Sequence, residues 1–114
     1  MPSMTIQTCG LPSKQRFFNY RGNSTDGIIL EYPSGNRSVP REVIDNLLNR
    51  YEGGVMLGAS MTNPVEGGVG EFISMQQVNL TPRHASHIIG VLFHEERVEI
   101  NHRGNAVEVI FPIR

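Results

Sequence analysis

Apolar and polar positions along the first 39 residues follow the pattern of short β-strands. Met4–Thr8 alternates apolar and polar side chains, Arg16–Tyr20 is aromatic-rich, and Ile28–Tyr32 combines branched and aromatic residues. These patterns are typical of half-buried strands. Turn-forming residues at 21–27 and 33–36 separate the segments, and 37–39 is expected to return as a short antiparallel partner. We therefore expect residues 1–39 to form a β-rich N-terminal extension of one domain.

A helical pattern begins near Pro40, a residue that suits the first turn of a helix because its missing N–H is not needed there. The apolar residues that follow share one helical face. They are Val43, Ile44, Leu47, Leu48 and Tyr51. Gly53 and Gly54 are expected to end this helix, and Val55–Leu57 is expected to form a brief strand.

A weaker helical pattern covers residues 69–77, where several glycines disfavour a helix. The glycine cluster at 67–70 also raises the possibility of a phosphate-binding loop. It lacks the lysine and following hydroxyl of a nucleotide-binding loop, so we interpret it as a plain loop.

The last third of the chain has the strongest pattern. Thr81 can cap a helix and Pro82 fits its first position, while Glu95–Glu96 closes it. The apolar stripe of this helix consists of Ala85, Ile88, Ile89, Leu92 and Phe93. A hairpin is expected to follow, with strands at 97–100 and 106–111 and a turn at 102–105.

Composition indicates one domain spanning 1–114, of the α+β class. The chain has 114 residues, of which 39% are hydrophobic and 18% charged, as in folded proteins. Cys9 is the only cysteine and cannot form an internal disulfide, which favours a reducing compartment. The sequence has no apolar run of about 20 residues and no signal-peptide layout at its start. We therefore expect a cytoplasmic protein with no membrane partner.

The succession helix, short strand, helix, helix, strand, strand over residues 40–114 resembles a winged helix-turn-helix domain. The segments 85–92 and 98–109 carry this resemblance, which is one of pattern rather than of a diagnostic motif. It implies that helix 81–94 lies in the major groove of DNA and that the wing at 101–105 contacts the backbone or minor groove. The implied DNA-binding residues are Arg83, His84, Ser86 and His87 on the helix and His102 and Arg103 on the wing.

Charge works partly against this interpretation. The net charge is −1, with ten basic and eleven acidic residues, whereas DNA-binding domains normally present a basic face. Glu95, Glu96, Glu99 and Glu108 lie near the expected binding surface and would repel phosphates. The alternative is a protein-interaction or accessory domain that acts through its sheet or through a homodimer interface.

A second candidate surface combines basic and aromatic residues near the N-terminus. Its members are Lys14, Arg16, Phe18, Tyr20 and Arg21. Such a combination can attract phosphates and stack on bases, as in proteins that bind single strands. The competing interpretation is that Phe17 or Phe18 enters the core, because the faces of a strand alternate.

Neither catalysis nor metal binding has a recognisable motif in this sequence. Ser86 and His87 are neighbours on a helix and point about 100° apart, which makes them a poor catalytic pair. His84 and His87 could share a metal ion only with a ligand from elsewhere, because His94 is about 10 Å further along the helix. We expect a non-enzymatic protein without a cofactor.

Overall fold

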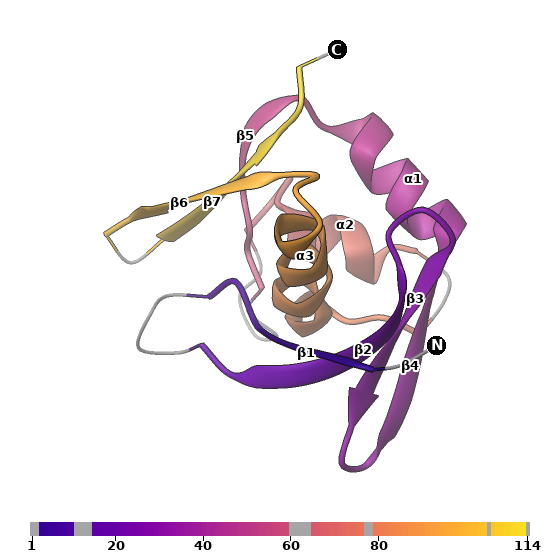
Figure 1. Ribbon diagram of the computed structural model, residues 1–114. Helices are drawn as coiled ribbons and strands as arrows, with labels where there is room; N and C mark the ends of the chain where they lie inside the picture. The colour runs from indigo at the N-terminus through magenta and orange to yellow at the C-terminus, as the bar shows by residue number, and fades with distance from the viewer. Residues whose placement is uncertain (1–2, 11–14, 60–64, 77–78, 105, 114) are drawn as a thin grey trace.

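The computed structural model describes residues 3–10, 15–59, 65–76, 79–104 and 106–113, and shows an α+β fold (Figure 1). An N-terminal antiparallel sheet has the strand order β1-β2-β3-β4, and a C-terminal antiparallel sheet has the order β5-β7-β6. The central helix α3 lies between the two sheets, and α1 and α2 pack on its remaining side.

The N-terminal sheet contains more strand than the sequence patterns predict. Its strands are β1 (Met4–Gln7), β2 (Phe17–Asn23), β3 (Gly27–Tyr32) and β4 (Gly35–Pro40). The turn predicted at residues 21–27 is confined to residues 24–26, because β2 continues to Asn23 and β3 begins at Gly27. The turn itself is short, since the Asn23 side chain accepts hydrogen bonds from the Thr25 and Asp26 amides at 2.9 and 2.8 Å.

The three predicted helices are present, with different bounds. They are α1 (Arg41–Arg50), α2 (Val69–Ser74) and α3 (Ala85–His94), and a 3-10 turn at Pro82–His84 precedes α3. Helix α2 ends before the predicted residue 77, at Ser74, whose hydroxyl donates to the Glu71 carbonyl at 2.7 Å. Helix α3 ends at His94, with Glu95 as its C-cap as predicted, and Glu96 reverses the chain with a φ of 61°.

The C-terminal sheet consists of β5 (Gly53–Met56), β6 (Glu99–Arg103) and β7 (Ala106–Phe111). Gly53 and Gly54, expected only to end a helix, begin β5 and pair with Phe111 and Ile110. Strand β6 begins two residues later than predicted. His102 and Arg103 therefore belong to the strand rather than to the turn, because Arg103 pairs directly with Ala106.

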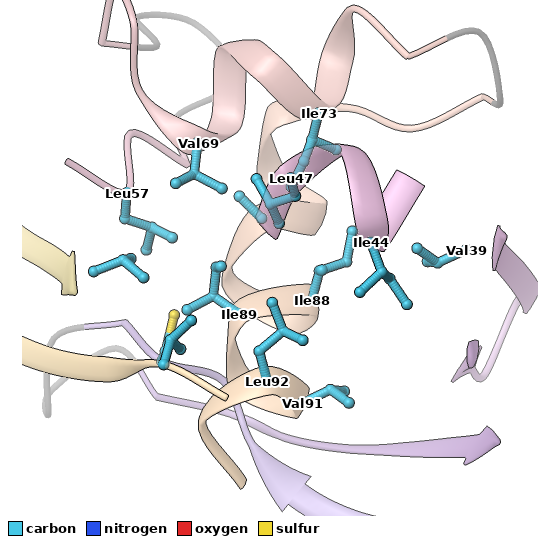
Figure 2. Close-up of a cluster of buried hydrophobic side chains, with 14 of the residues drawn as sticks. Val39, Ile44, Leu47, Leu57, Val69, Ile73, Ile88, Ile89, Val91 and Leu92 are labelled. Carbon is cyan, nitrogen blue, oxygen red and sulfur yellow. The ribbon is translucent and has the colours of Figure 1, made fainter. Parts of the chain in front are cut away.

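One hydrophobic core joins all of these elements. Figure 2 shows Ile88, Ile89 and Leu92 of α3 among side chains from α1 and α2. Phe93, predicted to belong to this buried stripe, is instead 51% exposed. The five consecutive residues from Ile88 to Leu92 are all buried, so the middle of α3 is covered on every side.

The end of strand β1 and the two residues that follow it, Thr8 and Cys9, cover α3 at close range. The amide of Cys9 donates to the Ser86 carbonyl at 3.1 Å. One turn further along, a Cβ on Gly90 would lie 3.0 Å from the Gln7 carbonyl oxygen. Glycine at this position therefore lets the strand and the helix approach closely.

A second set of contacts fastens the far end of α3 to the β2–β3 turn. The Glu95 carboxylate accepts hydrogen bonds from the Tyr20 hydroxyl at 2.9 Å and the Ser24 amide at 2.8 Å. Arg97 then donates to the Ser24 hydroxyl at 2.9 Å. The N-terminal sheet is therefore part of the same domain as the helices. No helix in the described part of the chain is long and apolar enough to cross a membrane.

Candidate functional site

The start of α3 is held by a side chain that folds back on the preceding turn. The amide of Thr81 donates to Nδ1 of His84 at 3.0 Å, and the amide of His84 donates to the Thr81 carbonyl at 3.0 Å. Because a backbone N–H can only donate, Nδ1 carries no proton, and the neutral imidazole holds its proton on Nε2. This contact places the His84 ring 6.0 Å from that of Tyr32, centroid to centroid.

His87, one turn along, joins the helix to the sheet through aromatic contacts. Its ring lies edge-on to Phe18, with centroids 4.8 Å apart, and edge-on to Tyr32 at 5.3 Å. Edge-to-face pairs at these distances are favourable. The residues that the sequence assigned to two separate surfaces, His87 and Phe18, are thus in direct contact.

Both histidines are half-buried, and both have lowered pKa values. Burial is the largest cause for each. The positive charge of Arg37 further lowers the pKa of His84, and that of Arg83 acts on both rings. Because the ordinary pKa of histidine is about 6.5, both imidazoles are neutral at pH 7.

Two adjoining hollows meet at Tyr32, and we refer to them together as the Tyr32 groove. The larger, of about 660 Å³, is lined by Ser3, Phe17, Phe18, Asn19, Glu31, Tyr32, Pro33, Asn36 and His87. The smaller, of about 230 Å³, is lined by Tyr32, Ser34, Gly35, Arg37 and His84. Phe17 is 73% exposed at the groove, on the face of β2 opposite to buried Phe18.

The lining of this groove contains one basic side chain, Arg37, and one acidic side chain, Glu31, and Arg83 precedes the lining residue His84 in the chain. Arg37 and Arg83 are both exposed, and neither forms an ion pair within the described residues. Glu31, the carboxylate in the lining, is paired with Arg21 at 3.0 Å and also accepts a hydrogen bond from the Ser3 hydroxyl. The groove therefore combines planar rings with cationic groups, an arrangement that can hold anionic or aromatic ligands.

The other predicted helix and wing residues lie outside the groove. Ser86 faces β1 through its backbone, and its hydroxyl donates to the Arg83 carbonyl at 3.2 Å. His102 is exposed on β6, with Nε2 3.1 Å from the Gly10 carbonyl oxygen. The backbone of Arg103 pairs in β6, while its side chain lies outside the described part of the structure.

The predicted basic-aromatic surface is divided by the pleat of β2. Phe18 and Tyr20 point into the core rather than onto a surface, as the competing interpretation allowed for Phe18. Arg16 is exposed, Arg21 pairs with Glu31, and Lys14 lies outside the described residues. The exposed ring is that of Phe17.

Sequence reasoning missed Tyr32 and Arg37 as site residues, and it considered Phe17 and Phe18 together without deciding which of them is exposed. Alternation along β2 indicates that one of two adjacent phenylalanines is exposed, yet it does not say which. Tyr32 and Arg37 come together with α3 only through the β3–β4 hairpin, in which Tyr32 pairs with Gly35 and Leu30 with Arg37. Because this packing joins segments that are far apart in the chain, the residues around Tyr32 and Arg37 in the sequence do not indicate that the two side chains meet α3.

A third hollow, of about 270 Å³, lies between β1, the end of α3 and β6. It is lined by Ile6, Gln7, Thr8, Cys9, Gln15, Gly90, Phe93, His94, Ile100 and His102. It shares no lining residue with the Tyr32 groove. His102 and His87, predicted as wing and helix residues of one DNA-binding surface, therefore line different hollows.

The glycine-rich segment before α2 has its amides engaged within the protein. Gly67 donates to the Glu71 carboxylate at 3.1 Å, Gly68 to the Val65 carbonyl at 3.0 Å, and Gly70 to the Leu57 carbonyl at 2.8 Å. This agrees with a structural loop rather than an anion cradle. Within the described residues, no group of three or more His, Cys, Asp or Glu side chains could hold a metal ion.

Comparisons of the chain with protein-family models, curated proteins and solved structures find no significant match. Its function must therefore be argued from the site itself.

Proposed function

We propose that this protein is a small, non-enzymatic nucleic-acid-binding module and that the Tyr32 groove is its contact surface. The observation that carries the proposal is that Arg37 lines one hollow with Tyr32 and His84, while Tyr32 also lines the adjoining hollow with Phe17. The positive charge of Arg83 acts on the His84 ring at the edge of the groove. Arginines supply phosphate contacts and rings supply base contacts, which is the usual division in such proteins.

A winged-helix arrangement over residues 40–114 is part of this proposal. The order α1, β5, α2, α3, β6, β7 is the succession on which the resemblance rests, and β5 joins the hairpin as a third strand. Arg83, His84 and His87 at the start of α3 are the predicted binding residues that line or border the groove. Glu95, one of the glutamates that weakened the interpretation, is turned toward Tyr20 and Ser24.

The test is binding of fluorescein-labelled nucleic acid, followed by anisotropy at about 50 mM salt, where the phosphate contribution is strong. Arg37→Ala and Arg83→Ala should each weaken binding and lower the salt slope by about 0.7 to 0.9 for each phosphate that the variant no longer neutralises. Arg50→Ala is the matched control, because Arg50 is an exposed arginine on α1 that does not line the groove. No binding by the parent protein would contradict the proposal.

The free strand edges favour a second candidate, contact with a protein or a second copy of this chain. Strand β4 lies at the edge of its sheet, and Gly35–Ser38 is exposed throughout. Arg37 on this edge weighs against simple edge pairing, because a charged side chain on an edge strand discourages it. Light scattering after size exclusion separates the two candidates: a dimer abolished by substitutions in β4 would favour this alternative.

A further inference from the structure

We infer that the Tyr32 groove selects single-stranded nucleic acid over duplex, with Phe17 as a base-stacking residue. This inference rests on the proposed function and names the form of nucleic acid that the groove accepts. It assigns a role to the most exposed aromatic ring at the groove.

The covering of α3 argues against entry into a duplex groove. A recognition helix needs an open face to reach base edges in the major groove. Residues Ile88–Leu92 are buried over more than one full turn, and β1 and the two residues after it contact the helix at Ser86 and Gly90. Helix α3 reaches the surface only near its ends, where Ser86 and His87 are partly exposed in its first turn and Phe93 and His94 are exposed in its last.

The wing does not restore a duplex-binding surface. In the proposed arrangement it would act together with the start of α3, on one continuous stretch of DNA. Here His102 lines the hollow beside β1, whereas His87 lines the Tyr32 groove, and the two share no lining residue. The backbone at Cys9 and Gly10 contacts Ser86 and His102, so protein backbone rather than open surface lies between the two predicted contact regions.

The rings of the groove suit unpaired bases. Phe17 is 73% exposed, and Tyr32 and His87 form the adjoining wall. In a duplex the base faces are hidden by neighbouring pairs, whereas an unpaired base presents its face for stacking. A ring with so little contact within the protein is available for such a partner.

A cation adjoins these rings. Arg37 lines the smaller hollow with Tyr32 and His84, and Tyr32 also lines the hollow that contains Phe17. Arg83, which is exposed and precedes His84, lies at the start of α3. Sequence-tolerant single-strand binding uses this pairing of a positively charged groove with stacking rings.

The experiment compares one labelled oligonucleotide of about 12 nucleotides, of mixed sequence, with its own duplex. We expect the single strand to bind at least about tenfold more tightly than the duplex. Phe17→Ala should weaken single-strand binding by roughly 5- to 150-fold, the usual effect of removing one stacking ring. Phe93→Ala is the control, since it removes another exposed ring, in the hollow beside β1.

The outcomes distinguish the proposed nucleic-acid binding from the inferred preference for single strands. Duplex binding that equals or exceeds single-strand binding would overturn the inference and leave the proposed function standing. Absence of binding to either form at about 50 mM salt would overturn both. Equal affinities of Phe17→Ala and the parent for the single strand would overturn the stacking role, and circular dichroism of the variant checks that its fold is intact.

Discussion

The imidazole of His87 lies edge-on to the ring of Phe18, with centroids 4.8 Å apart and ring planes at 71°. This contact joins the first turn of α3 to β2. His87 and Phe18, which were predicted to lie on two different binding surfaces, are thus in contact. Phe18 is buried in the core, whereas its neighbour Phe17 is exposed to solvent. The Tyr32 groove forms beside it, bordered by the β3–β4 turn.

Tyr20 and Tyr32 should respond differently to removal of the hydroxyl. Tyr20 donates to the Glu95 carboxylate at 2.9 Å, so Tyr20→Phe should lower the free energy of unfolding by roughly 1.5–3 kcal/mol. The buried Tyr32 hydroxyl has no hydrogen-bond partner within the described residues. Tyr32→Phe should therefore change the free energy of unfolding by less than about 0.5 kcal/mol. Urea unfolding measures both, and equal destabilisation would contradict the assigned contacts.

Alanine should destabilise helix α2 more at one position than at another. A Cβ on Gly70 would overlap the Gly58 carbonyl oxygen, so Gly70→Ala should cost about 1–3 kcal/mol of unfolding free energy despite the higher helix propensity of alanine. Ser74→Ala places the same residue at an exposed position of the same helix and should cost less than about 1 kcal/mol, because the higher helix propensity of alanine partly offsets the lost hydroxyl bond to the Glu71 carbonyl. Thermal and urea unfolding report the difference, and a stabilised Gly70→Ala variant would refute the close approach.

Stability should fall as the pH drops below about 6.5, the ordinary pKa of histidine. Burial lowers the pKa of His84 and His87 in the folded protein, so the unfolded chain binds more protons between the folded and unfolded values. The free energy of unfolding therefore rises with pH across that window and levels off above it.

Two variants isolate these rings. His84→Asn keeps an acceptor for the Thr81 amide, and His87→Phe keeps a ring beside Phe18. Together they should flatten the pH dependence between about 5 and 7. A parent slope retained in the double variant would contradict the assignment of this pH dependence to His84 and His87.

The thiol of Cys9 should be inert in the folded protein. Cys9 is buried, and burial raises the pKa of its thiol to about 12, so almost no thiolate exists at neutral pH. A chromogenic disulfide reagent should therefore react slowly with the native chain and titrate one thiol after unfolding. Rapid reaction under native conditions would show that β1 separates from α3.

Local pattern predicted most of the secondary structure of this chain, because apolar periodicity and capping residues act over short distances. The apolar stripe through Ile88 and Leu92 correctly indicated α3, and Pro40 lies immediately before α1. Boundaries failed where pairing outweighed local turn signals. Gly22 and Asn23 continue β2, and Gly53 begins β5, because each finds a partner strand.

The site was less predictable, since it depends on which strand covers which helix. The helical pattern implied one buried stripe on α3, whereas β1 buries Gly90 on another side. Phe93 belongs to the predicted stripe but is exposed, because no described element packs closely against its side chain. The residues that complete the groove, Tyr32 and Arg37, come from a hairpin far from α3 in sequence.

The most direct test of the account is a ¹H–¹⁵N NMR titration of the full chain with a single-stranded oligonucleotide of about 12 nucleotides. If the strand binds in the Tyr32 groove, amide shift changes will concentrate at Phe17, at Tyr32–Arg37 and at Arg83–His87. Amides around Glu66 and Arg50, remote from the groove, should remain unshifted. Shifts concentrated at His94 and His102, around the hollow beside β1, would contradict the assignment of the Tyr32 groove as the nucleic-acid contact surface.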